Sequence, residues 1–156
     1  SFPLTFVAPE PYVWVFPAPV PTYDPITQHP VEGAPELNVK GTWNQTWTLV
    51  DYDADQVAAN QAAKVAALQQ SVIQQTQSRL DDFAKTRNYD GILSACTYAT
   101  SPTTKFSTEG QYCVEARDAT WSALYTIMAE VEAGTRPMPN SYADIEPDLP
   151  VLTWPV

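Results

Sequence analysis

Apolar positions recur at helical spacing along one uninterrupted stretch of the chain, from Asp53 to Lys85. The pattern predicts a single long helix whose first turn is capped by Asp53 and by Gln56, three residues later. Alanine and glutamine fill most of the intervening positions and leave a narrow stripe, which is typical of close contact between helices. We therefore expect copies of this helix to pair as a homo-oligomer, a trimer before a dimer, through the middle of the stripe. The stripe comprises Val57, Val65, Leu68, Val72, Thr76, Leu80 and Phe83, and its middle is Val65, Leu68 and Val72.

Before this helix the apolar pattern changes to a period of two. Residues 36–39 form a short alternating run, Lys40 and Gly41 form a turn, and residues 42–50 form a longer run that predicts a strand. The alternation places Trp43 and Trp47 on the same face. The sequence therefore predicts a β-hairpin with tryptophans covering one side.

Two further helices are expected after the long one. A break at residues 86–91 precedes a short helix, for which Asp90 can serve as the cap. The last helix begins at Pro102, because proline is tolerated in a first turn, or at Thr108, because a glycine two residues further on weakens the earlier start. Gly134 marks its end.

The predicted fold is mainly α with a small β-hairpin. The long helix and the C-terminal helices form a helical hairpin, flanked by an extended proline-rich N-terminal arm and a C-terminal tail. We expect three parts: residues 1–35 as the extended arm rich in proline and aromatic residues, residues 36–136 as the β-hairpin and helical domain, and residues 137–156 as a proline-rich docking tail with one turn of helix at 141–146.

The arm differs in composition from an ordinary linker. Nine of the 15 prolines fall within the first 40 residues, which favours polyproline II or a lone strand. Linkers are polar, whereas this segment is rich in aromatic residues, and large exposed apolar surface marks an interaction site. A disordered tail is the alternative interpretation. The residues expected to bind partners through the arm and the tail are Phe6, Tyr12, Trp14, Phe16 and Trp154.

Charge and hydropathy exclude two classes of partner. The 156 residues carry a formal net charge of −10, and the eight Lys and Arg form no cluster, so we expect no binding to nucleic acid or to an anionic membrane. No apolar run is long enough to span a bilayer, and the prolines of the first 20 residues break any signal-peptide helix. We expect a whole protein made in the cytoplasm.

No constellation of residues predicts catalysis, a cofactor or a metal site. Cys96 and Cys113 either pair or are two small buried side chains, and with a single histidine they cannot complete a common zinc site. The acidic residues at 51, 53 and 55 lack the glycine and the glutamate that a calcium loop needs. The carboxylate pairs at 81–82 and 130–132 are expected on solvent faces. Arg117 and Asp118 form either a polar lock to another subunit or a charge pair packed against the break at residues 89–91.

A series of short motifs resembles a known group of proteins. The motifs are Gly41-Thr-Trp-Asn-Gln-Thr-Trp, Tyr89-Asp-Gly-Ile, Ala116-Arg-Asp-Ala-Thr-Trp121, Glu130-Val-Glu-Ala-Gly-Thr-Arg-Pro and the Leu-Pro-x-Leu-x-Trp-Pro ending. The chain from about residue 36 to residue 155 is similar to the small tail-fibre and tail-associated structural proteins of contractile-tailed bacteriophages. The resemblance implies a non-enzymatic virion component, made in the host cytoplasm and located in the phage tail at the baseplate or fibre. Its partners would be other fibre or baseplate subunits. A tail-fibre assembly chaperone that is absent from the virion is the alternative.

Overall fold

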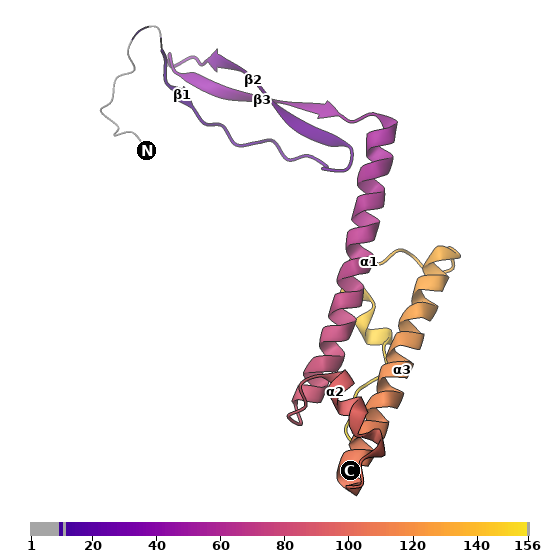
Figure 1. The fold of residues 1–156 in the computed structure, drawn as a ribbon. Helices are drawn as coiled ribbons and strands as arrows, with labels where there is room; N and C mark the ends of the chain where they lie inside the picture. Colours follow the sequence, from indigo (N-terminus) through magenta and orange to yellow (C-terminus); the bar gives the residue numbers. More distant parts are fainter. Residues whose placement is uncertain (1–9, 11, 156) are drawn as a thin grey trace. The chain divides into compact units, whose positions relative to one another are not determined.

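The computed structural model describes residue 10 and residues 12–155, and residues 1–9, 11 and 156 lie outside the described part. The described chain is mainly helical with a small three-stranded sheet, which confirms the predicted class (Figure 1). It divides into two compact units, residues 1–63 and residues 64–156. The strands belong to the first unit, and α1 (Ala54–Lys85) crosses the boundary.

The sheet of the first unit has the strand order β1-β3-β2. The three strands are β1 (Val15–Phe16), β2 (Gln28–Leu37) and β3 (Trp43–Asp51). β2 and β3 form the expected antiparallel hairpin, and β1 pairs with β3 in parallel. β2 begins at Gln28, which is eight residues earlier than the alternation indicated, so the hairpin includes the end of the predicted arm. The two prolines of β2 are compatible with this, because β2 is an edge strand and Pro35 lies in the irregularity between Gly33 and Glu36.

The predicted turn at Lys40 and Gly41 is confirmed. Gly41 has a φ of 77°, which favours glycine, and the Asn38 side chain accepts hydrogen bonds from the backbone N–H groups of Lys40 and Thr42. Beyond the turn, the register places Trp43 opposite Leu37 and Trp47 opposite Glu32. Alternation along β3 then keeps both tryptophans on one face, as expected. The Trp47 indole N–H donates to the carbonyl of Ala18, so the segment after β1 returns beside β3.

Helix α1 begins where the sequence predicted. The Asp53 carboxylate accepts a hydrogen bond of 2.8 Å from the backbone N–H of Gln56, and its carbonyl accepts the N–H of Val57. The expected reciprocal bond is absent, because the Gln56 side chain bonds to Asn60 within the helix instead. One cap and an uninterrupted stripe therefore suffice to define the start of this helix.

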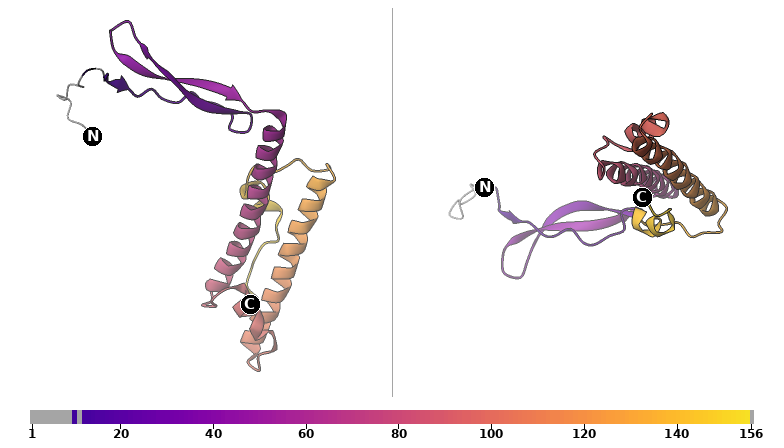
Figure 2. Two further views of the ribbon diagram at one scale, coloured as in Figure 1. Left: turned by 45° about the horizontal axis from the view of Figure 1, so that its top comes forward. Right: turned by 90° about the horizontal axis from the view of Figure 1, so that it is seen from below.

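Five further elements complete the described part of the second unit. They are α2 (Ile92–Cys96), η1 (Thr97–Thr100), α3 (Thr104–Glu132), η2 (Tyr142–Asp144) and η3 (Glu146–Asp148), where η denotes a 3-10 helix. Among them, η1 packs on α3. α1 and α3 lie side by side in the views of Figures 1 and 2. The short helix α2 is capped by Asp81, whose carboxylate accepts the backbone N–H of Ile92 at 2.8 Å, and the predicted cap by Asp90 is wrong. α3 begins at Thr104, between the two predicted starts, and ends before Gly134, which has a φ of 71°.

Two apolar clusters form the core of the second unit. The first joins Val72 of α1 to Leu124 and Ile127 of α3, and it is completed by residues from the C-terminal segment, Tyr142, Ile145 and Leu149. The second surrounds Leu80 and includes Ala84, Ile92, Ala95 and Cys113. The apolar stripe of α1 from Val72 onward is therefore covered by the helices and the C-terminal segment of its own chain.

Candidate interaction surfaces

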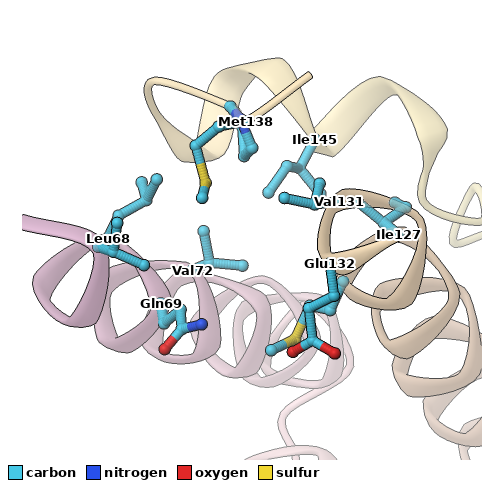
Figure 3. A pocket seen from close by; sticks show the side chains of 11 residues that line it. Leu68, Gln69, Val72, Ile127, Val131, Glu132, Met138 and Ile145 are labelled. Carbon is cyan, nitrogen blue, oxygen red and sulfur yellow. The ribbon is translucent and has the colours of Figure 1, made fainter. Parts of the chain in front are cut away.

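An apolar groove in the second unit contains the residues predicted to form the oligomer contact. It has a volume of about 180 Å³ and is bounded by α1, by the last turns of α3 and by residues 138–145 (Figure 3). Val65 and Leu68 are half-buried on its wall, whereas Val72 is only 4% exposed and belongs to the core. The groove therefore unites the three predicted residues but leaves only Val65 and Leu68 accessible to a partner. Its lining comprises Val65, Leu68, Gln69, Val72, Ile127, Met128, Val131, Glu132, Met138, Pro139 and Ile145.

The C-terminal segment docks on the helices of its own chain. The Trp154 ring stacks on Phe83 with a centroid distance of 4.3 Å, and its indole N–H donates to the Thr86 hydroxyl at 2.8 Å. The guanidinium of Arg87 lies 5.0 Å from the centroid of the same ring. These intramolecular contacts give the tryptophan a structural role, so its position provides no support for the partner-binding role expected from the sequence.

A polar cluster between α1 and α3 surrounds Glu109, which is 3% exposed. Its two carboxylate oxygens accept bonds from the Arg87 guanidinium and, at 2.7 Å, from the Tyr89 hydroxyl. Burial acts to raise the pKa of Glu109, but the bonds from Tyr89 and Arg87 outweigh it and hold the pKa below its usual value. Burial and the nearby carboxylate raise the pKa of Tyr89 to about 12.

The polar cluster opens onto a hollow of about 390 Å³. Among the residues that line it, Glu109 is the single carboxylate, and both of its oxygens are already engaged. General acid–base chemistry needs a group that is free to exchange a proton with a substrate. Arg87 and Tyr89 belong to the segment between α1 and α2, so their bonds to Glu109 attach that segment to α3. The sequence indicated Arg117 and Asp118 as candidates for this contact.

Arg117 and Asp118 lie close enough to Cys96 to affect the pKa of its thiol, and the two roles expected for this pair stay predictions. Burial is the main cause of the raised pKa of the Cys96 thiol, and the two charged side chains shift it in opposite directions. Cys113 is buried in the core, and burial raises its pKa to about 11. Both cysteines are free thiols, and at such pKa values the unreactive protonated form dominates at neutral pH. In the described part of the chain, no group of three or more His, Cys, Asp or Glu side chains is placed to hold a metal ion.

The first unit contrasts with this packed core. Among the described residues, none before Val72 is buried, and large apolar side chains of the predicted arm are exposed. Tyr12 is 73% exposed, Phe16 54% and Trp14 43%, while Phe6 lies outside the described residues. These three aromatics are exposed, their partner-binding role stays a prediction, and the sequence did not indicate that they lie beside a sheet.

A row of apolar side chains crosses all three strands at the tip of the hairpin. Val15 pairs with Trp43, and Trp43 pairs with Leu37, so the three side chains project from one face of the sheet. We call them the tip row; their exposed fractions are 38%, 36% and 57%. Sequence reasoning missed this row because a parallel pairing of two residues has no local signal, although the alternation did place Trp43 on a face.

Carboxylates without cationic partners accompany the tip row. Glu32 lies opposite Trp47, on the same face as Trp43, and accepts a hydrogen bond from the Gln45 side chain at 2.8 Å. Asp51 accepts one from Gln28 at 2.7 Å. All ion pairs of the described chain join residues 79–148, so within residues 10–63 no carboxylate is neutralised by a cation.

No family model, curated protein or solved structure matches the chain. The described residues contain no helix with the length and apolar character needed to cross a membrane.

Proposed function

We propose that the protein is a non-enzymatic structural subunit that acts by docking to other proteins through its N-terminal unit. The observation that carries the proposal is the absence of any buried residue before Val72 in the described chain, together with the exposed aromatics of that unit. A hairpin without a covered face is marginal in water, and three strands become stable when an apolar face is packed. The unit therefore needs a partner surface to supply that packing.

The setting we propose is the tail of a contractile-tailed bacteriophage, at the baseplate or fibre, on the basis of the resemblance in sequence. Residues 12–24, which run beside β3 of their own chain, would present Tyr12, Trp14 and Phe16 to a neighbouring subunit as anchors. The helical hairpin of α1 and α3 would serve as the folded base that carries this arm. Large aromatic side chains contribute most to binding when they enter pockets of a partner, which suits such an arm.

Self-association belongs to the same proposal, with the trimer preferred over the dimer. The structure restricts where α1 could pair, because Val72 is occupied by its own chain whereas Val65 and Leu68 remain half-exposed. From Ala54 to Ser71 the helix carries two charged residues, Asp55 and Lys64, so electrostatic repulsion between copies is small there. This half of α1 is the part we expect to lie in an oligomer contact.

Mass spectrometry of purified phage particles tests the proposed function. A virion subunit should give abundant peptides in particles and in isolated tails. Its absence from particles, together with a complex of the chain and a fibre protein in infected cells, would favour the assembly chaperone instead. A variant with Tyr12, Trp14 and Phe16 replaced by Ser should be lost from particles, while the exposed-site control Val151→Ser should be retained, since Val151 is 84% exposed and outside the proposed surface.

A further inference from the structure

The tip row is the best-defined apolar surface of the first unit, and its immediate surroundings indicate how a partner can approach it. β2 is an edge strand, but its outer edge is protected by Pro30 and by the irregularity around Pro35. Proline lacks the N–H group that an added strand would need, and bulges also oppose strand addition. The partner is therefore expected to contact the face of the sheet, where Val15, Leu37 and Trp43 project.

Charge determines the chemistry of that partner. Residues 1–63 contain seven carboxylates and one basic residue, Lys40, which gives a formal charge of −6 out of the total of −10. Two copies paired through this unit would bring two such net charges together, and like charges juxtaposed in an interface are unfavourable. The seven carboxylates are Glu10, Asp24, Glu32, Glu36, Asp51, Asp53 and Asp55.

Glu32 is an oriented carboxylate on this face that could bind a cation of the partner. Its Oε1 is held by the neutral amide of Gln45, which orients the carboxylate without neutralising its charge. Its Oε2 stays available. Glu36 is paired with Asn44, so it projects from the opposite face of the sheet and does not contribute to this surface. Charge-assisted bonds from Lys or Arg to an oriented carboxylate are shorter and stronger than neutral ones.

We infer that the tip row binds a partner protein surface whose apolar side chains are flanked by lysine or arginine. The apolar residues of the partner cover Val15, Leu37 and Trp43, and a cation beside them meets Glu32. This inference rests on the proposed docking function and adds the chemistry of the partner. A short peptide with leucines at its centre and lysines at both ends is a suitable probe, because leucines can cover the tip row while a flanking lysine reaches Glu32 on the same face.

The test uses the full chain and three matched synthetic peptides. The first has leucines at its centre and lysines at both ends, the second has Glu in place of Lys, and the third has Ser in place of Leu. Binding is followed by tryptophan fluorescence, since covering Trp43 should shift its emission to shorter wavelength. The Lys–Leu peptide should bind at least about tenfold more tightly than either of the others, and raising the salt from 0.05 to 0.5 M should weaken its binding several-fold.

Two classes of variant separate the apolar and electrostatic parts. Leu37→Ser should abolish the fluorescence shift, with circular dichroism showing whether the sheet persists. Glu32→Gln retains the size of the side chain and its capacity to bond Gln45, so it should preserve the sheet and still reduce both the affinity and the salt dependence. The matched control is Glu130→Gln in the second unit, which should change neither the affinity for the peptide nor its salt dependence.

Several results would overturn the inference. Equal affinity for the Lys–Leu and Glu–Leu peptides would exclude a charge-selected partner. Self-association that Leu37→Ser abolishes in sedimentation experiments would identify a second copy as the occupant. If the chain is present in particles and the Lys–Leu peptide does not bind, the inference fails while the proposed function stands. If the chain is absent from particles and the Lys–Leu peptide binds, the proposed virion function fails while the inference about the tip row stands.

Discussion

Gly110 allows α3 to pass directly against the backbone of η1. A Cβ at this position would lie 2.3 Å from the backbone nitrogen of Ala99 and 2.5 Å from the carbonyl carbon of Tyr98. Because backbone atoms cannot move aside as a side chain can, Gly110→Ala should destabilise the protein by about 3 kcal/mol, near the upper end of the usual cost of overpacking. Gly134→Ala is the matched control: it has open space but a positive φ, so its cost should be about 1 kcal/mol. Urea unfolding followed by circular dichroism measures the free energy of unfolding of both variants. A smaller loss of stability for Gly110→Ala than for Gly134→Ala would contradict the close approach of α3 to η1.

Glu109 should make stability depend on acid pH. Its pKa is lowered in the folded chain, so its contribution is complete above the unfolded value of about 4.3 and is lost as the pH falls through the folded value. Glu109→Gln should therefore cost about 1.5–3 kcal/mol at pH 7, and the difference from the wild type should shrink below about pH 4. Urea midpoints of both proteins between pH 3 and pH 8 provide the comparison. A difference that is constant with pH would show that the carboxylate charge is not responsible.

Tyr89 should produce the opposite dependence at alkaline pH. Its pKa is raised to about 12 in the folded chain, above the ordinary value of about 10. The resulting stabilisation is complete below about pH 10 and is lost as the pH rises toward 12. Tyr89→Phe should remove this decline. Burial also raises the pKa of Tyr142, so absorbance titration should show late-ionising phenolate in the wild type and less of it in Tyr89→Phe. Ionisation of all tyrosines near pH 10 would argue against the buried Tyr89–Glu109 bond.

At the scale of elements, the sequence predicted those features that depend on residues close together in the chain. The start of α1 follows from the Asp53 cap and its length from an uninterrupted apolar stripe, and the turn at Gly41 follows from its left-handed backbone. The start of β2 could not be predicted, because Pro30 and Pro35 oppose a strand unless the strand lies at an edge. The cap of α2 comes from Asp81, eleven residues before Ile92, and no sequence-local rule finds such a contact.

The docking site of the C-terminal segment is likewise formed by residues distant in the sequence. The apolar residues of this segment were expected to dock, but the surface that receives them is formed by α1 and α3. Tyr142, Ile145 and Leu149 are buried there, and burial of three large side chains contributes about 5–9 kcal/mol. This is comparable with the total stability of a typical domain. Deleting residues 138–156 should therefore abolish cooperative thermal unfolding, whereas Val151→Ser should leave it unchanged. A cooperative transition in the truncated protein would show that the helices are stable alone.

At the scale of the whole molecule, the buried residues are confined to one part of the chain. Every buried residue of the described chain lies between Val72 and Leu149, and both apolar clusters are formed by residues from Leu68 onward. Deleting residues 1–52 leaves the Asp53 cap and all of these residues in place. The truncated protein should therefore unfold in urea with a free energy within about 0.5 kcal/mol of the full chain, since changes away from buried features have effects of that size. A larger loss would mean that the first unit stabilises the helices.

The same deletion should have a severe effect on assembly. The exposed residues Tyr12, Trp14 and Phe16 and the tip row are removed together, so a protein that acts by docking would lose its contacts while retaining its core. The expected result is a soluble, helical, cooperatively unfolding protein that is missing from purified phage particles. Incorporation of the truncated protein at wild-type levels would show that the N-terminal unit does not anchor the subunit, and the docking role would then have to move to the groove lined by Val65 and Leu68.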